Sequence, residues 1–193
     1  SAYKMKGYSY PGTSPMNKNE GEEKEGKTIL DIGCSDGYYS IQCAKKNVKH
    51  AQGLDPDPLR IKRANFMKEL LEIDNVDFKV ADFYDLTEDK KYDIILGLGL
   101  IHRIPDILKC LEKMSRLSDI LVLEFKTYDS PEDTCTTTEQ KKKHNEYNKI
   151  YSIPTQTYVK NRMEEFGFKY NSFFDDDSHL KYKRTILVSS RKK

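Results

Sequence analysis

LDIGCSDGYYS, residues 30–40, is an apolar run followed at once by two glycines and two aspartates. A glycine-rich turn after a strand often binds phosphate, and GxGxxG is its dinucleotide-binding form. Here Ser35 and Tyr38 occupy the second and third glycine positions of that pattern. Asp31 and Asp36 also place carboxylates at the turn, where they would repel a phosphate through poorly screened space. The segment therefore predicts a strand, a turn and a helix that bind a positively charged ligand.

The rest of the chain alternates short apolar runs with stretches of helical periodicity. The apolar runs predict strands at 28–32, 50–55, 76–82, 92–99 and 119–125. The periodic stretches predict helices at 38–46, 57–71, 104–117 and 155–166. Because strands alternate with helices, we predict an α/β domain with a parallel sheet. Two last runs, 168–174 and 184–190, predict an antiparallel hairpin at the edge of that sheet.

Two segments fall outside this alternation. Residues 1–27 are polar and contain several glycines and prolines, so we expect a mobile N-terminal segment ahead of a domain at 28–193. Residues 128–149 are polar and rich in lysine, which predicts a long loop or a weak helix. This second segment could act as a lid.

Composition narrows the class of protein. With 33 Lys and Arg against 31 Asp and Glu, the 193-residue chain has a net charge of +2, which neither favours nor excludes a nucleic-acid partner. Its four cysteines form no CxxC pair, and no His, Cys and Asp cluster has metal-site spacing. The run 94–101 is too short to cross a bilayer, and no signal peptide is evident. We expect a soluble cytoplasmic domain without a metal.

Two further acids end predicted strands. Asp55 ends the second strand in GLDPD, and Asp82 ends the third in VADFYD. Ligands of open α/β sheets bind at the edge formed by the carboxyl ends of the strands. Asp55 could accept hydrogen bonds from ribose hydroxyls there, and Asp82 could accept one from an adenine amino group, with Phe83 beside the ring. S-adenosylmethionine, which joins an ammonium and a sulfonium to adenosine, is the ligand that this set favours.

Each of these assignments has a plainer alternative. Gly33 and Gly37 could be ordinary glycines of a strand-to-helix turn. Asp55 could cap the second helix, although Asp57 stands in a better position to do so. Asp82 could stabilise a turn.

The chain resembles the class I S-adenosylmethionine-dependent methyltransferases over residues 28–190. LDIGCSDG is similar to their glycine-rich first motif, and the two last strands resemble the hairpin that completes their sheet. It also resembles the catalytic domain of the tRNA wobble-uridine (carboxy)methyltransferase group in GLDPDPLRI, LGLGLIHR, YSIPT, EEFGF and KRTILVSSRK. The resemblance implies a Rossmann-like, doubly wound, seven-stranded and mostly parallel sheet with a C-terminal antiparallel β-hairpin.

The resemblance and the strand-end acids together define a cofactor-binding set. Its members are Asp31, Gly33, Cys34, Ser35, Gly37, Asp55, Pro56, Asp82, Phe83 and Gly97. Within it Cys34 is interpreted as a packing residue near the cofactor, because nothing in its surroundings favours a thiolate.

His102, which follows the fourth predicted strand, is the candidate catalytic residue. It could act as a general base, or it could orient other groups as in related methyltransferases. The expected reaction is an in-line methyl transfer without a metal, to an RNA or tRNA base or to a small molecule. Two alternatives stay open: a catalytically inactive cofactor-binding or partner subunit, and an NAD-dependent oxidoreductase, which the altered glycine pattern disfavours.

The chain also departs from the carboxymethyltransferases that it resembles. Those enzymes use a carboxylated S-adenosylmethionine and bind its extra charge with a tyrosine before the histidine and an arginine near the last strands. Here Ile101 takes the tyrosine's place, and the arginine's segment is shortened to DDDSHLKYK. We also expect the polar residues 1–27 in place of their large N-terminal region. We therefore expect plain S-adenosylmethionine as donor, unless Tyr38, Arg103 or Tyr147 supplies the missing contacts.

Overall fold

A computed structural model describes residues 26–46, 48–140, 149–176 and 183–192 of the chain. The expected mobile segment at 1–27 therefore lies almost wholly outside the described residues, as does Tyr147. Within the described part, no helix is long and apolar enough to span a membrane.

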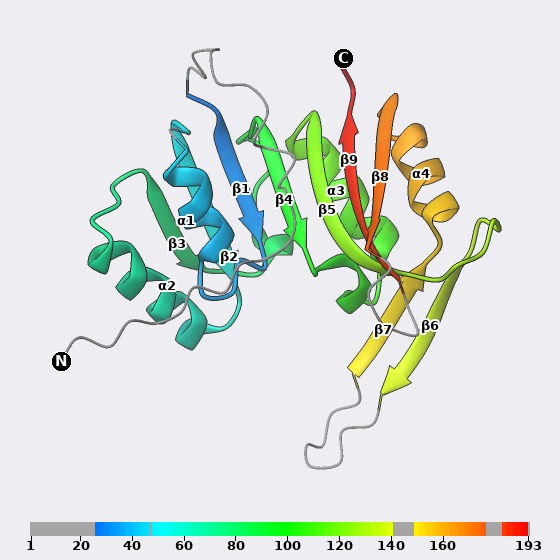
Figure 1. Ribbon diagram of the computed structural model, residues 1–193, viewed down its shortest axis with the longest axis horizontal. Helices are drawn as coiled ribbons and strands as arrows, with labels where there is room; N and C mark the ends of the chain where they lie inside the picture. The colour runs from blue at the N-terminus through cyan, green and yellow to red at the C-terminus, as the bar shows by residue number, and fades with distance from the viewer. Residues whose placement is uncertain (1–25, 47, 141–148, 177–182, 193) are drawn as a thin grey trace.

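One seven-stranded sheet forms the centre of the molecule (Figure 1). Its strands, in spatial order, are β3 (Val76–Val80), β2 (His50–Asp55), β1 (Thr28–Ile32), β4 (Ile94–Leu98), β5 (Ile120–Thr127), β9 (Lys183–Ser190) and β8 (Tyr170–Asp176). The first five are parallel, whereas β9 runs antiparallel between β5 and β8. The strand order reverses at β1, so the expected doubly wound, mostly parallel sheet with a terminal antiparallel hairpin is confirmed.

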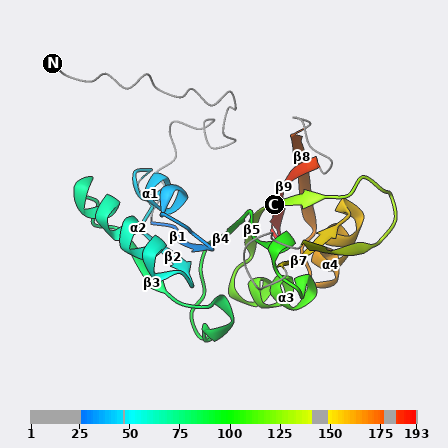
Figure 2. The same cartoon turned by 90° about the horizontal axis from the view of Figure 1, so that it is seen from below.

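Four α-helices cover the two faces of this sheet. They are α1 (Tyr38–Ala44), α2 (Pro58–Leu70), α3 (Ile107–Leu117) and α4 (Gln156–Glu165), with 3-10 turns η2 (Phe83–Asp85) and η3 (Ile101–Arg103). Figure 2 shows α1 and α2 on one side of the sheet and α3 and α4 on the other. Alternate strand residues face the two layers: Ile29 packs with the first helix pair and Leu30 with the second.

The start of α2 follows directly from its sequence. The Asp57 side chain accepts a hydrogen bond from Leu59 N at 2.9 Å, and Pro58 occupies the first turn. A carboxylate at this position pairs a backbone N–H that would otherwise have no partner, and proline loses nothing there. The predicted cap is confirmed, which leaves Asp55 available for another role.

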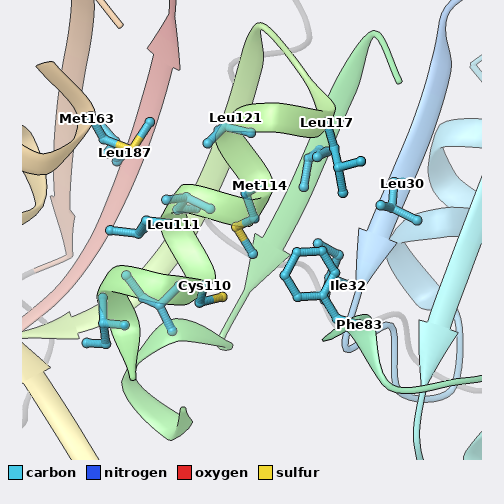
Figure 3. Packing of buried hydrophobic residues seen from close by; sticks show 14 of the residues in the cluster. Leu30, Ile32, Phe83, Cys110, Leu111, Met114, Leu117, Leu121, Met163 and Leu187 are labelled. Atoms are coloured by element: carbon cyan, nitrogen blue, oxygen red, sulfur yellow. The ribbon is translucent and has the colours of Figure 1, made fainter. Parts of the chain in front are cut away.

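The larger of two apolar clusters in the described part lies between α3 and the face of the sheet to which β1, β4, β5 and β9 contribute (Figure 3). Leu111, Met114 and Leu117 of α3 are fully buried against strand residues such as Leu121. Burying side chains of this kind stabilises the fold by roughly 1.5–3 kcal/mol each. This packing fixes the ends of β4 and β5 relative to α3, and so the edge at which the candidate site lies.

The segment at 128–149 differs from the expected loop or weak helix. Residues Cys135–Gln140 form β6 and Lys149–Pro154 form β7, and the two pair antiparallel as a separate two-stranded sheet. β-branched threonines in the first strand favour this extended pairing over a helix. Residues 141–148, between the two strands, lie outside the described residues.

Candidate active site

The glycine turn crosses the end of β2 in a left-handed conformation. Gly33, Ser35 and Gly37 have φ angles of 72°, 53° and 80°. Gly33 N and Cys34 N both donate to Leu54 O, at 2.8 and 3.0 Å. A Cβ on Gly37 would lie 2.5 Å from Phe78 Cζ, so no other residue fits there. The turn is thus fixed by its backbone, at the edge toward which β1 and β4 point in Figure 1.

Asp55 connects this turn to α2. Its side chain is buried and accepts hydrogen bonds from Ser35 N at 3.0 Å and from Asp57 N at 2.9 Å. Arg60 Nη1 lies 3.9 Å from Asp55 Oδ2 and donates to Ser35 Oγ at 3.2 Å. A carboxylate has about four acceptor sites, so lone pairs stay available for ligand hydroxyls. The ribose role of Asp55 stays a prediction.

Asp31 is the most deeply buried acid of the site. It is 2 % exposed, and Ser40 Oγ of α1 donates to its Oδ2 at 2.6 Å. Burial raises the pKa of Asp31 to about 6, against the lowering effect of the Ser40 hydrogen bonds, and the charge of Asp55 raises it further. A cationic ligand beside Asp31 would lower that pKa again. Asp36, in contrast, lies at the surface, 3.8 Å from Arg63 Nη1.

The acid expected at the end of β3 lies just beyond that strand. β3 ends at Val80, and Asp82 caps η2 by accepting a hydrogen bond from Tyr84 N at 2.9 Å. Asp82 is exposed, whereas Phe83 is buried in the larger apolar cluster. The turn alternative therefore describes what Asp82 does within the chain, and the adenine contacts of both residues stay predictions.

Three members of the predicted set have structural surroundings that account for them. Cys34 is buried, and burial raises the pKa of its thiol, which agrees with a packing role. A Cβ on Gly97 would lie 2.9 Å from Leu123 Cδ2 and 3.1 Å from Met114 Cε, so core packing requires glycine there. Pro56 is exposed between Asp55 and the cap of α2. Their cofactor contacts stay predictions.

His102 lies inside the molecule, on η3, which packs against β5 and β7. It is 0 % exposed, and its Nδ1 accepts a long hydrogen bond from Lys126 N at 3.4 Å. Its Nε2 has no hydrogen-bond partner among the described residues. Burial, followed by the charges of Arg103, Arg184 and Lys126, lowers the pKa of His102 to about 3. A neutral, weakly basic ring favours the orienting alternative over the general base, whose pKa should lie near the working pH.

Sequence reasoning missed Ser40, which donates to Asp31, and Arg60, which lies 3.9 Å from Asp55 and donates to Ser35. Both residues lie in the first turn of the helix that follows their acid, on the side facing back to the strand end. A polar residue in the first turn of the helix after each acid was the sequence feature that could have indicated them. Among the described residues, no group of three or more His, Cys, Asp or Glu side chains is placed to hold a metal ion.

This glycine turn, with buried acids at the ends of β1 and β2 of a doubly wound sheet, lies where open α/β sheets bind their ligands. Residues 23–168 match the family described as "Methyltransferase domain". The chain belongs to this methyltransferase-domain family.

Particular relatives and structures refine this assignment. A tRNA U34 carboxymethyltransferase of Aliarcobacter butzleri is 30% identical over 151 residues, which cover 74% of this chain and 47% of that protein. The same enzyme of Nautilia profundicola is 29% identical, covering 75% and 48%. The chain thus spans about half the length of these curated relatives. The crystal structure of the N-terminal domain of EvdMO1 with SAH bound superposes with a TM-score of 0.72 at 19% identity, covering 88% of this chain and 76% of that one.

Proposed function

We propose that the chain is an S-adenosylmethionine-dependent methyltransferase. The observation that carries the proposal is the pair of buried carboxylates, Asp31 and Asp55, beside a turn that has no GxGxxG pattern. A dinucleotide would bring phosphates to this position, and two buried acids oppose them. The family membership and the fold shared with a domain that binds SAH support the same ligand.

The residues of the site fit this cofactor by charge and by hydrogen-bonding capacity. When bound, S-adenosylmethionine supplies a methyl group on a positively charged sulfur. Ionised Asp31 offers a negative charge to the ligand's cationic end, and Asp55 offers acceptors to hydroxyls. The backbone of the Gly33–Gly37 turn allows close approach because two of its residues have no side chain. Holding the two reactants in place provides most of the acceleration in such a transfer.

The methyl acceptor that we propose is a tRNA base or a small molecule. A tRNA acceptor is supported by relatives that are named for tRNA U34 and that match most of this chain. It would place the enzyme in the cytoplasm, where tRNA is found. His102 is proposed to orient neighbouring groups as a neutral ring, and the residues around the acceptor determine which molecule is methylated.

Calorimetry tests the cofactor assignment directly. We expect S-adenosylmethionine and S-adenosylhomocysteine to bind with micromolar or tighter affinity, and NAD not to bind. Asp55→Ala should weaken binding of the sulfur ligands. Asp74→Ala is its matched control, because Asp74 is an exposed aspartate beyond α2. Binding of NAD, or of neither sulfur ligand, would refute the proposal. A tritiated-methyl assay on tRNA and on small-molecule extracts then identifies the acceptor, and a protein that binds the cofactor without methylating either fraction is the inactive alternative.

A further inference from the structure

Two cations lie side by side where β5 ends and β9 begins. Lys126 and Arg184 are directly paired in the antiparallel register of the two strands. Directly paired residues project from the same face with their Cβ atoms about 5 Å apart, and like charges in that position destabilise a sheet. The arrangement is therefore unfavourable unless negative charge is supplied.

The chain itself supplies only part of that charge. Glu124 forms an ion pair with Arg184, and Asp176 is directly paired with Arg184 in the register of β8 with β9. Lys126 and Arg103, which is exposed at the end of η3, have no side-chain partner among the described residues. Lys183 is 3.1 Å from Asp129 and so is already paired. The group formed by Arg103, Lys126 and Arg184, here called the basic cluster, thus carries three positive charges against two carboxylates, Glu124 and Asp176.

Buried His102 connects the members of the basic cluster. Its Nδ1 accepts the hydrogen bond from Lys126 N, Arg103 follows it directly in η3, and Arg184 is paired with Lys126 across the two strands. The ring adds no charge, because it is neutral at physiological pH. Its Nε2 is a further buried polar atom without a partner in the described part of the chain. Three cations and an unsatisfied ring nitrogen together resemble a site for a polar, anionic group.

The position of the basic cluster relates it to the proposed reaction. β1, β4 and β5 are parallel neighbours, so their carboxyl ends lie at one edge. The glycine turn follows β1, while η3 and Lys126 lie at the ends of β4 and β5. The basic cluster is therefore beside the cofactor turn, but displaced along the edge by the width of two strands. This is where a second reactant would approach.

We propose that Arg103, Lys126 and Arg184 form a subsite that binds a phosphate or carboxylate group of the methyl acceptor. The proposal rests on the methyltransferase function proposed above and narrows its substrates to anionic ones. Arg184 keeps Glu124 as a partner when no acceptor is bound, whereas Lys126 and Arg103 gain their first partner on binding.

Inorganic phosphate is a suitable probe, measured by the thermal shift of the protein saturated with S-adenosylhomocysteine at constant ionic strength. We expect phosphate to raise the melting temperature, and Lys126→Gln and Arg103→Gln each to weaken phosphate binding by about tenfold, the scale of one charge-assisted contact. Lys79→Gln is the matched control, since Lys79 is an exposed lysine of β3 at the far end of the sheet. It should change binding less than about twofold.

Repeating the titration with acetate distinguishes whether the subsite binds a phosphate group or a carboxylate group. A preference for phosphate indicates a nucleotide or RNA acceptor, and a preference for acetate indicates a carboxylic acid. The proposal is wrong if neither anion binds, or if Lys79→Gln weakens binding as much as Lys126→Gln. It is also wrong if the variants lose affinity only for a carboxylated S-adenosylmethionine, because the cations would then serve the donor. S-adenosylhomocysteine binding to the same variants reports separately on the cofactor assignment.

Discussion

The carboxyl edge of the sheet presents buried acids at β1 and β2, and at β5 and β9 two neighbouring cations with Glu124 and Asp176 next to Arg184. At β1 and β2, Asp31 and Asp55 are buried and held by Ser40 and by backbone N–H groups. At β5 and β9, Lys126 and Arg184 are half-buried, and Lys126 has no side-chain partner in the described part. Buried charges in fixed positions suit a single ligand. Long lysine and arginine side chains near the surface can adjust to ligands of different shape. Under the two proposals above, the acidic half binds the methyl donor and the basic half binds the acceptor.

Removing one acid of the acidic half, Asp55, should have the largest effect on cofactor affinity. We expect Asp55→Ala to weaken binding of S-adenosylmethionine by about 1.5–3 kcal/mol, because hydrogen bonds to a charged group are lost. The variant should still fold, since Asp57 caps α2 without it. Calorimetry provides the affinity, and inorganic phosphate should bind as in the parent chain. An unchanged cofactor affinity would mean that the ribose lies elsewhere.

Asp31→Asn should change stability in a way that depends on pH. The pKa of Asp31 is raised from 3.8 to about 6, so its contribution to stability is present below pH 3.8 and is lost as the pH rises through 6. Keeping this buried carboxylate ionised above pH 7 costs about 3 kcal/mol. The variant should therefore be about 1–3 kcal/mol more stable at pH 8 and show little gain near pH 4, measured by urea unfolding.

Cofactor binding provides the control for Asp31. The parent chain should bind S-adenosylmethionine more tightly as the pH rises through about 6, because the cationic ligand requires the ionised acid. Asp31→Asn should bind weakly at every pH. A stability gain that is the same at pH 4 and pH 8 would contradict this account.

His102→Gln tests whether His102, which lies on η3 between the two halves of the edge, acts as a catalytic base. A base with a pKa of about 3 contributes little at neutral pH, so turnover should fall less than about tenfold. The pKa of His102 is lowered from 6.5, so the parent chain loses stability as the pH falls from 6.5 toward 3, and the variant should lose less over that range. A fall in turnover of about 10²–10⁴ with intact cofactor affinity would establish His102 as the base instead.

The smallest effect is expected for Ile101→Tyr on the preference between S-adenosylmethionine and its carboxylated form. Ile101 is 0 % exposed in the larger apolar cluster, so its side chain contributes to packing. Ile101→Tyr should destabilise the fold by about 1–3 kcal/mol through overpacking and should not create a preference for the carboxylated donor. Competition between S-adenosylmethionine and its carboxylated form measures this. Tighter binding of the carboxylated form to the parent chain would overturn the prediction of a plain methyl donor.

The acidic half was accessible from sequence because its residues are close in the chain. The turn, its two glycines and Asp31 fall within eleven residues, and Asp55 ends the next strand, so periodicity and turn chemistry were sufficient. The basic half was not accessible. Lys126 and Arg184 meet only through the register of β5 with β9, which no local pattern specifies.

The polar β6–β7 hairpin was missed for a related reason. Its strands pair with each other and not with the main sheet, so they lack the apolar run of a central strand. The segment that joins them in the sequence is longer than a short hairpin turn, so no turn motif indicates the pairing. The end of β3 was placed two residues too late, because Asp82 uses its side chain to start a 3-10 turn.

The same hairpin is a separate two-stranded sheet that is inserted into the domain. Tyr128 N donates to Pro154 O at 3.1 Å, so the insertion leaves and rejoins the domain at one place. Doubling the length of a closed loop costs only about 0.6 kcal/mol. Because β7 packs on η3 and no strand of the hairpin pairs with the main sheet, a change in the hairpin would act on η3 and not on the turn at Gly33. Insertions and deletions in this hairpin can therefore reshape the surroundings of Arg103 on η3 while the turn at Gly33 keeps its conformation.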